Sequence, residues 1–161
     1  MRAHRLALSL AGALVLSACS SLNPFSSEGK PPALKPLVSP VKVSESWRAR
    51  VDDAGIFVFQ PAISGGAVFA TGKDGEVTRI ESGRSVWKTP LKTTVSGGVG
   101  SDGNLVAVGT PKGEVIALDA ASGEIKWRVA ISAEVLAPPA VSDGIIVVRS
   151  ADSRLFGLDP A

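Results

Sequence analysis

The sequence has few of the side chains on which most catalytic and metal sites depend. Its 161 residues include one cysteine (Cys19), one histidine (His4), one methionine and no tyrosine. Because Cys19 and His4 both lie near the N-terminus, no zinc site, Cys/His pair or Ser/His/Asp triad can be assembled from the rest of the chain. We therefore predict a protein with no catalytic residue, no metal site and no bound cofactor.

The chain also lacks an excess of charge of one sign. It carries 17 basic and 15 acidic residues, and two of the basic ones, Arg2 and Arg5, lie in a segment that we expect to be removed. The remaining 15 basic and 15 acidic side chains balance, and they form no basic run. A nucleic-acid partner is therefore excluded, because it would require a positively charged surface.

Long apolar runs are missing as well. The longest mainly apolar stretch, Leu6 to Leu16, is shorter than the roughly 20 residues that a membrane-spanning helix needs. Basic residues precede it and the small residues Ser17 and Ala18 follow it, which is the pattern of a secretory signal. We predict a signal peptide over residues 1–18.

Cys19 follows this stretch directly. Leu16-Ser17-Ala18-Cys19 resembles a bacterial lipobox, which implies cleavage before Cys19, a diacylglyceryl group on its thiol and an acyl chain such as palmitate on its amine. In such lipoproteins Ser20, where an aspartate would retain the protein, implies export to the outer membrane. A plain signal peptide with an incidental cysteine is the alternative.

Proline is concentrated in the next segment, residues 19–45. Five of the eleven prolines lie there, among serines and lysines: Pro24, Pro31, Pro32, Pro36 and Pro40. Such a composition is too poor in apolar residues to form a core and favours an extended chain. We predict a lipidated, flexible tether.

Three tryptophans divide the remainder, residues 46–161. Trp47, Trp87 and Trp127 are forty residues apart, and similar turns and apolar runs recur between them. A period of about 40 residues is typical of repeat architectures. We predict repeats over about 46–87, 88–127 and 128–161.

Each repeat has the pattern of an antiparallel meander. Between the second and third tryptophans, short β-branched runs bounded by Asp-Gly and Lys-Gly predict strands over roughly 95–99, 105–109, 114–119 and 124–131. Four strands in about 40 residues is the size of a β-propeller blade, and one blade cannot bury both of its faces alone. The predicted fold class is all-β, a β-propeller with about three blades present.

One motif connects the blades. Ala117-Leu118-Asp119-Ala120-Ala121-Ser122-Gly123-Glu124-Ile125-Lys126-Trp127 resembles the tryptophan-docking signature of PQQ-like, or quinoprotein-like, propellers. We expect Asp119 to bind turn amides, Gly123 to supply a left-handed corner and Trp127 to cover the joint between blades. The first repeat keeps only Gly83 and Trp87 of this motif.

Other polar or flexible positions have simpler explanations. Asp74, Asp102, Asp143 and Asp152 are expected to form turns. The glycine cluster Gly97-Gly98-Val99-Gly100 could suggest a phosphate cradle, but no helix follows it, and such a cradle needs a helix N-terminus.

The lipobox, tether and tryptophan-spaced blades together resemble the BamB family of outer-membrane lipoproteins. The resemblance extends over essentially the whole chain and about the first two-fifths of a family member, so we expect a fragment of a longer protein. It implies a strand at Ser46-Trp47, followed by a long loop from Asp52 to Phe59, in the family's opening blade. It implies a non-catalytic scaffold of the β-barrel assembly (BAM) complex, lipid-anchored on the periplasmic face of the outer membrane. The implied partner is the POTRA domains of BamA, through loops beyond Ala161 and partly by strand-edge pairing.

Two other functions remain open at this point. The same propeller repeats occur in PQQ-dependent dehydrogenases, which would bind quinone and Ca²⁺ at the propeller centre. Reduction of a dye in the presence of quinone, Ca²⁺ and substrate would indicate that class. A periplasmic sensor or peptide-binding lipoprotein is the third class.

Overall fold

The computed structural model describes residues 34–35 and 41–159. Cys19 and most of the expected tether lie outside these residues. Ser44–Ala161 forms one compact unit of the chain.

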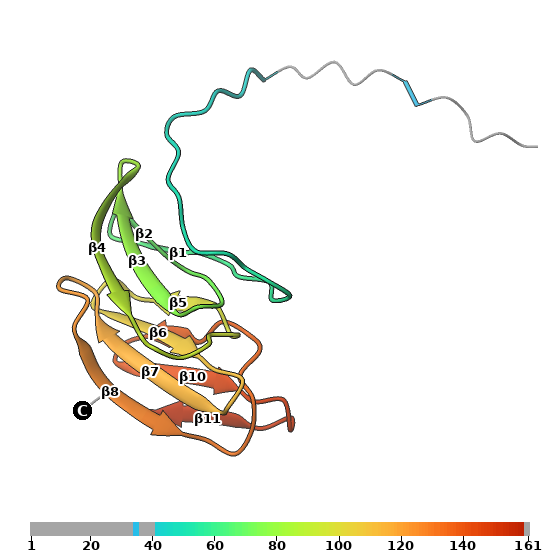
Figure 1. Ribbon diagram of the computed structural model, residues 1–161, viewed down its shortest axis with the longest axis vertical. Coiled ribbons are helices and arrows are strands. Elements are labelled where there is room, and N and C mark those ends of the chain that lie inside the picture. The colour runs from blue at the N-terminus through green and yellow to red at the C-terminus, as the bar shows by residue number, and fades with distance from the viewer. Residues whose placement is uncertain (1–33, 36–40, 160–161) are drawn as a thin grey trace, which may run out of the picture. The chain divides into compact units, whose positions relative to one another are not determined.

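Strands make up all the regular structure of the described residues, in three consecutive antiparallel sheets (Figure 1). The first sheet contains β1 (Ala62–Ser64), β2 (Ala67–Thr71), β3 (Glu76–Glu81) and β4 (Arg84–Pro90). The second contains β5 (Val99–Ser101), β6 (Leu105–Gly109), β7 (Glu114–Asp119) and β8 (Ile125–Ala130). The third contains β9 (Ala140–Ser142), β10 (Ile145–Arg149) and β11 (Leu155–Leu158). Within each sheet the strands follow in chain order, as in a meander.

The predicted strands of the second repeat agree with the structure except for the first. The prediction placed it at 95–99, whereas β5 covers Val99–Ser101. The amides of Ser96 and Gly97 both donate to the Gly109 carbonyl instead of forming a regular ladder, and Gly98 has φ +68°. A left-handed residue interrupts a strand, so pairing begins only at Val99.

A second expectation was also wrong in detail. The sequence suggested a strand at Ser46–Trp47, but residues 41–61 contain no strand. The other two tryptophans do lie in strands, Trp87 in β4 and Trp127 in β8.

The middle sheet is buried on both faces. Every residue of β6 is buried, although successive side chains of a strand point to opposite faces. Val106 and Val108 join a core cluster with Phe69 of the first sheet. Leu105 and Ala107 belong to a second cluster, which continues into the third sheet. The sheets therefore stack face to face, each supplying part of a neighbour's core, as Figure 1 shows for β3, β7 and β10.

The third sheet buries one face only. Ile146 and Val148 of β10 pack against the second sheet, whereas Ile145, Val147 and Leu155 are exposed. Their counterparts one repeat earlier are Leu105, Ala107 and Val115, which are the residues that the second sheet buries against the third. This exposed face has the apolar composition of a blade-to-blade contact.

Candidate functional site

The best-defined polar site is the joint between the first two sheets, where Trp87 reaches the second repeat. Its indole Nε1 donates to the Ala120 carbonyl at 3.1 Å. Beside it, the Thr89 hydroxyl donates to the Gly123 carbonyl at 2.7 Å. The ring also lies against Phe69, with 6.0 Å between centroids. Two side chains of β4 thus hold the turn that follows β7.

Gly123 is needed at this joint for two reasons. Its φ is +78°, a conformation that side chains with a Cβ rarely adopt. A Cβ here would also lie 2.7 Å from the Trp87 ring. The ring therefore occupies the space that any larger residue would fill.

Asp119 shapes the same turn by accepting hydrogen bonds. Its carboxylate accepts from the backbone amides of Ala121 at 3.0 Å and Ser122 at 2.9 Å, and Lys126 lies 3.5 Å away. The hydrogen bond from the Ser122 amide is the largest of the effects that lower the pKa of Asp119 below its ordinary value. The hydrogen bonds of this turn therefore stabilise the ionised form of the Asp119 carboxylate.

We expect Asp119→Asn to change the pH dependence of stability. The pKa of Asp119 is lower in the folded than in the unfolded protein. The carboxylate therefore stabilises the folded state fully above the unfolded pKa of about 4, and this stabilisation is lost as the pH falls through the folded pKa. The difference in unfolding free energy between the two proteins should be largest near neutral pH and shrink in acid. Urea unfolding between pH 3 and 7 measures it, and a difference independent of pH would contradict the assignment.

The first repeat builds its turn from other residues. Ser82 and Gly83, with φ of +47° and +80°, link Glu81 directly to β4. Arg79 pairs with Trp87, and Ala117 with Trp127, so the connection between paired residues is two residues shorter in the first repeat than in the second. Arg79 occupies the place of Ala117, and its guanidinium bonds Glu81 at 2.5 Å. This pair replaces the alanine and aspartate of the motif.

Arg79 also crosses to the second sheet. It donates to the Ala120 carbonyl at 2.9 Å, the same atom that accepts from Trp87. It further lies over the Phe69 ring, 5.9 Å from the centroid. No motif in the sequence indicated this contact, because it is specific to one joint.

At the next joint, Trp127 takes the corresponding position. It packs beside the second core cluster, which includes the fully buried Ala117. Its Nε1 is buried and has no acceptor among the described residues. One repeat earlier the acceptor is Ala120, whose counterpart, Pro160, lies outside the described residues.

Gly83 completes the set of residues that the motif indicated. A Cβ at this position would lie 2.9 Å from the Trp47 side chain. Trp47 therefore covers Gly83 as Trp87 covers Gly123, one repeat earlier in the chain.

The glycine cluster at 97–100 brings backbones together. A Cβ on Gly100 would lie 1.9 Å from the Pro139 carbonyl oxygen, and one on Gly97 would lie 2.9 Å from that of Ala137. The backbone of Gly97 and Gly100 passes so close to the segment that leads into the third sheet that neither position has room for a side chain. Close packing explains the glycines without a bound phosphate.

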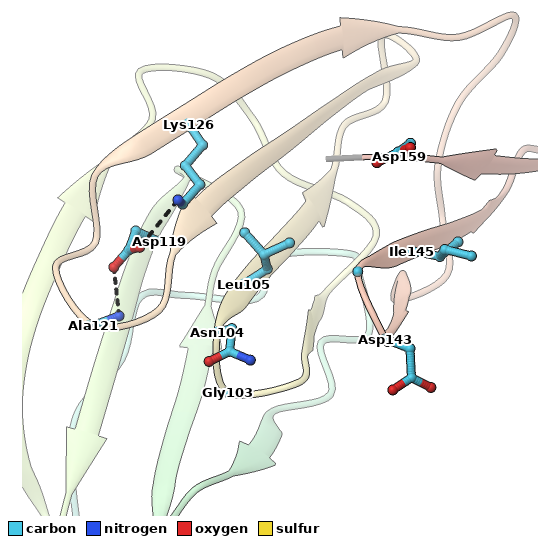
Figure 2. Close-up of a pocket in the computed structure, with 10 residues that line it drawn as sticks. Gly103, Asn104, Leu105, Asp119, Ala121, Lys126, Asp143, Ile145 and Asp159 are labelled. Carbon is cyan, nitrogen blue, oxygen red and sulfur yellow. Dashed lines mark hydrogen bonds and ion pairs between the residues drawn. The ribbon is translucent and has the colours of Figure 1, made fainter. Parts of the chain in front are cut away.

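A cavity of about 590 Å³ opens between the second and third sheets (Figure 2). It is lined by the hairpin tips at Asn104 and Asp143 and by Asp119 and Lys126. Figure 2 shows the Asp119 carboxylate bonded to Lys126 and the Ala121 amide, and the Asp143 carboxylate pointing away from it. The acidic side chains do not converge on a common point.

Within residues 34–35 and 41–159, no cluster of three or more His, Cys, Asp or Glu side chains is arranged to hold a metal ion. The same residues include no helix of the length and apolarity needed to span a membrane.

Comparison with known proteins identifies the repeat. The family profile described as outer membrane protein assembly factor BamB matches residues 73–161. The outer membrane protein assembly factor BamB of Bordetella pertussis is 40% identical over 156 residues, which are 96% of this chain and 40% of that protein. This chain thus spans about two fifths of the length of the curated relative.

Solved structures show the same fold. BamB from Moraxella catarrhalis superposes with a TM-score of 0.59 and 31% identity, over 63% of this chain and 32% of that one. A quinohemoprotein alcohol dehydrogenase from Pseudomonas putida gives a TM-score of 0.61 at 21% identity, over 71% of this chain and 20% of that one. The three sheets are therefore PQQ-like propeller blades and form part of a propeller.

Proposed function

Because this chain belongs to the BamB family of outer membrane protein assembly factors, we propose that it forms the first blades of a non-catalytic scaffold that assists β-barrel assembly in the outer membrane. The observation that carries this proposal is the family match over residues 73–161, which include β3, β4, the whole of the second and third sheets and the joint at Trp87. The likeness to the alcohol dehydrogenase, at 21% identity, concerns the fold alone.

Rigid blade stacking is what the described residues contribute to a scaffold. The docking residues Trp87, Asp119 and Gly123 hold two blades in one orientation, and we assign Trp127 and Ala117 the same task at the next joint. A rigid propeller presents loops at fixed positions, which lowers the entropic cost of binding a partner. We therefore assign these residues a structural role, without contact to a ligand.

The partner in this proposal is a BamA-type protein, bound through its periplasmic POTRA domains. The contact loops would lie in later blades, beyond Ala161. Strand-edge pairing suits such a contact, because backbone hydrogen bonds extend a sheet without requiring a particular side chain.

Co-purification tests the proposal. The gene product, tagged at its C-terminus and isolated from outer membranes in mild detergent, should retain a BamA-type protein. An unrelated tagged outer-membrane lipoprotein serves as the control. Recovery of the tagged protein without any BamA-type protein, or in equal amount with the control, would contradict a role in the assembly complex.

We further propose that Cys19 carries the lipid anchor on the periplasmic face of the outer membrane, with residues 19–45 as tether. More than one acyl chain is needed for stable anchoring, and a lipoprotein cysteine supplies them. Cys19 lies outside the described residues, so the sequence pattern alone supports this step.

Replacing Cys19 by serine should abolish lipid attachment. We expect cells grown with labelled palmitate to tag the unaltered protein and the control variant Ser20→Ala, but not Cys19→Ser. The Cys19→Ser protein should also leave the membrane fraction. Palmitate label that persists on Cys19→Ser would show that another residue is modified.

A further inference from the structure

The chain contains three Asp-Gly pairs, and they differ in how firmly the fold holds them. The pairs are Asp74-Gly75 between β2 and β3, Asp102-Gly103 between β5 and β6, and Asp143-Gly144 between β9 and β10. Such a pair can rearrange chemically, because glycine has no side chain to obstruct attack of its amide nitrogen on the preceding carboxyl group. Since the same two residues recur, differences in reactivity among the three sites must come from their surroundings.

Asp74-Gly75 is held at both of its reacting groups. The two carboxylate oxygens of Asp74 accept from the Lys73 ammonium group, each at 3.0 Å. The Gly75 amide, which would be the attacking group, donates to the Gly72 carbonyl at 3.2 Å. Gly75 is also buried, and a Cβ there would lie 2.1 Å from the Thr93 carbonyl oxygen. The amide and the carboxylate can therefore meet only if this turn opens.

Asp102-Gly103 is restrained in the same two ways. One carboxylate oxygen of Asp102 accepts from the backbone amides of Asn104 and Leu105, each at 2.8 Å. The Gly103 amide donates to the Ser101 hydroxyl oxygen at 3.1 Å. Ring closure at this site would break hydrogen bonds of both the carboxylate and the attacking amide.

Asp143-Gly144 has weaker restraints. Among the described residues, its carboxylate accepts a side-chain hydrogen bond only from the adjacent Ser142 hydroxyl, at 3.1 Å, and the Gly144 amide has no acceptor. Both residues are exposed at the tip of the hairpin, and a Cβ on Gly144 would meet nothing within 4 Å (Figure 2). Their φ values of +51° and +78° are those of a type I′ turn, which places Asp143 in the left-handed region that side chains with a Cβ rarely adopt.

We propose that Asp143-Gly144 is a site of isoaspartate formation. The Gly144 nitrogen bonds to Cγ of Asp143, and one carboxylate oxygen leaves as water with the amide proton and one proton from the solvent, which gives a five-membered succinimide. Addition of water at the Cγ carbonyl breaks the new bond and restores aspartate. Addition at the main-chain carbonyl of Asp143 breaks the original peptide bond instead and leaves the chain running through Cγ, as isoaspartate. Water is the only other reactant.

The product would disturb the hairpin that contains it. Ser142 and Ile145 are paired across this turn, so the loop between them has only two residues. Isoaspartate adds one methylene group to the main chain, and a tight two-residue turn cannot absorb the extra length while both flanking residues stay paired. The modification would therefore loosen the end of the β9–β10 ladder.

Peptide mapping of the aged protein tests the proposal. The gene product, folded and purified in mild detergent, is kept at neutral pH and growth temperature for several weeks and then digested with trypsin. Mass spectrometry with electron-transfer fragmentation distinguishes isoaspartate from aspartate. The three aspartates fall in separate tryptic peptides that contain no other aspartate, residues 74–79, 93–112 and 129–149.

We expect the isoaspartate fraction at Asp143 to exceed that at Asp74 or Asp102 at least about tenfold, because the other two sites must first lose hydrogen bonds. Equal fractions at the three sites, or no isoaspartate at Asp143, would overturn the proposal. In guanidinium chloride the three fractions should agree within about threefold, since the unfolded chain removes the restraints. The same excess at Asp143 in the unfolded protein would show that the fold does not select the site, and would also overturn it.

Two matched asparagine variants test access of the attacking amide. Asparagine forms the same succinimide faster, because ammonia leaves in place of water, and Asn-Gly is a favoured pair in type I′ turns, so Asp143→Asn should keep the hairpin. We expect at least about tenfold more isoaspartate at residue 143 of Asp143→Asn than at residue 102 of Asp102→Asn, where the Gly103 amide remains bonded to Ser101. Equal amounts in the two variants would overturn the proposal.

Discussion

Replacing Trp87 by alanine should lower the free energy of unfolding by about 3–5 kcal/mol, the range for truncating a large packed aromatic side chain. The ring fills the space above Gly123 and contacts Phe69, so its removal leaves a cavity between two blades. The hydrogen bond to the Ala120 carbonyl is lost with it. Because Arg79 still donates to that carbonyl, the substitution leaves no unpaired acceptor there.

Trp87→Phe is the matched control. It keeps most of the aromatic area but lacks the indole N–H, so it should cost about 1 kcal/mol from the hydrogen bond and somewhat more from the smaller ring. Urea unfolding of a soluble form of the gene product, without residues 1–19, measures both variants by circular dichroism. If Trp87→Ala and Trp87→Phe were equally stable, the ring would not be packed between the blades.

Most strands could be predicted from the sequence because their signals are local. Alternating apolar residues and Asp-Gly or Lys-Gly turns place 105–109 and 114–119 where β6 and β7 lie. The extent of β5 could not be read in this way. Val95 is apolar and fully buried, as a strand residue would be, but it lies in a connection that packs against another blade. Burial by a neighbouring blade and pairing in a strand both favour an apolar residue, so the sequence alone does not distinguish them.

The joint at the first repeat was the least predictable part of the candidate site. Gly83 and Trp87 were visible from the motif, whereas Arg79 was not, because it acts through a carbonyl 41 residues away. Arg79 stands where the second repeat has the small Ala117, and a shorter turn at Ser82 accompanies the change. Such compensating differences depend on three-dimensional proximity, which a repeat alignment within one chain does not reveal.

For Trp47, the sequence predicted the docking position correctly but not the secondary structure. The forty-residue spacing correctly grouped it with the other two tryptophans, but the sequence suggested a strand where none forms. A strand requires a neighbour that provides hydrogen bonds, and the described residues provide none for residues 46–51. The docking contact with Gly83 survives because it needs only the next blade, which is present.

Substituting alanine for Gly100 should also be strongly destabilising, by about 1–3 kcal/mol or more. The added Cβ would lie 1.9 Å from the carbonyl oxygen of Pro139 and 2.8 Å from its carbonyl carbon. Backbone atoms cannot move aside as the end of a flexible side chain can, so the third sheet would have to shift away from the second. The second core cluster, which both sheets share, would lose packing with it.

Gly157→Ala provides the control for this substitution, because a Cβ at Gly157 meets nothing within 4 Å and its backbone is not left-handed. Gly157 lies in β11, so alanine there tests the general effect of replacing a strand glycine without a clash. We expect its unfolding free energy to stay within about 0.5 kcal/mol of the unaltered protein or to rise slightly. Should Gly100→Ala unfold at the same urea concentration as Gly157→Ala, the two sheets would lie farther apart than described, and close approach would not explain the glycine cluster.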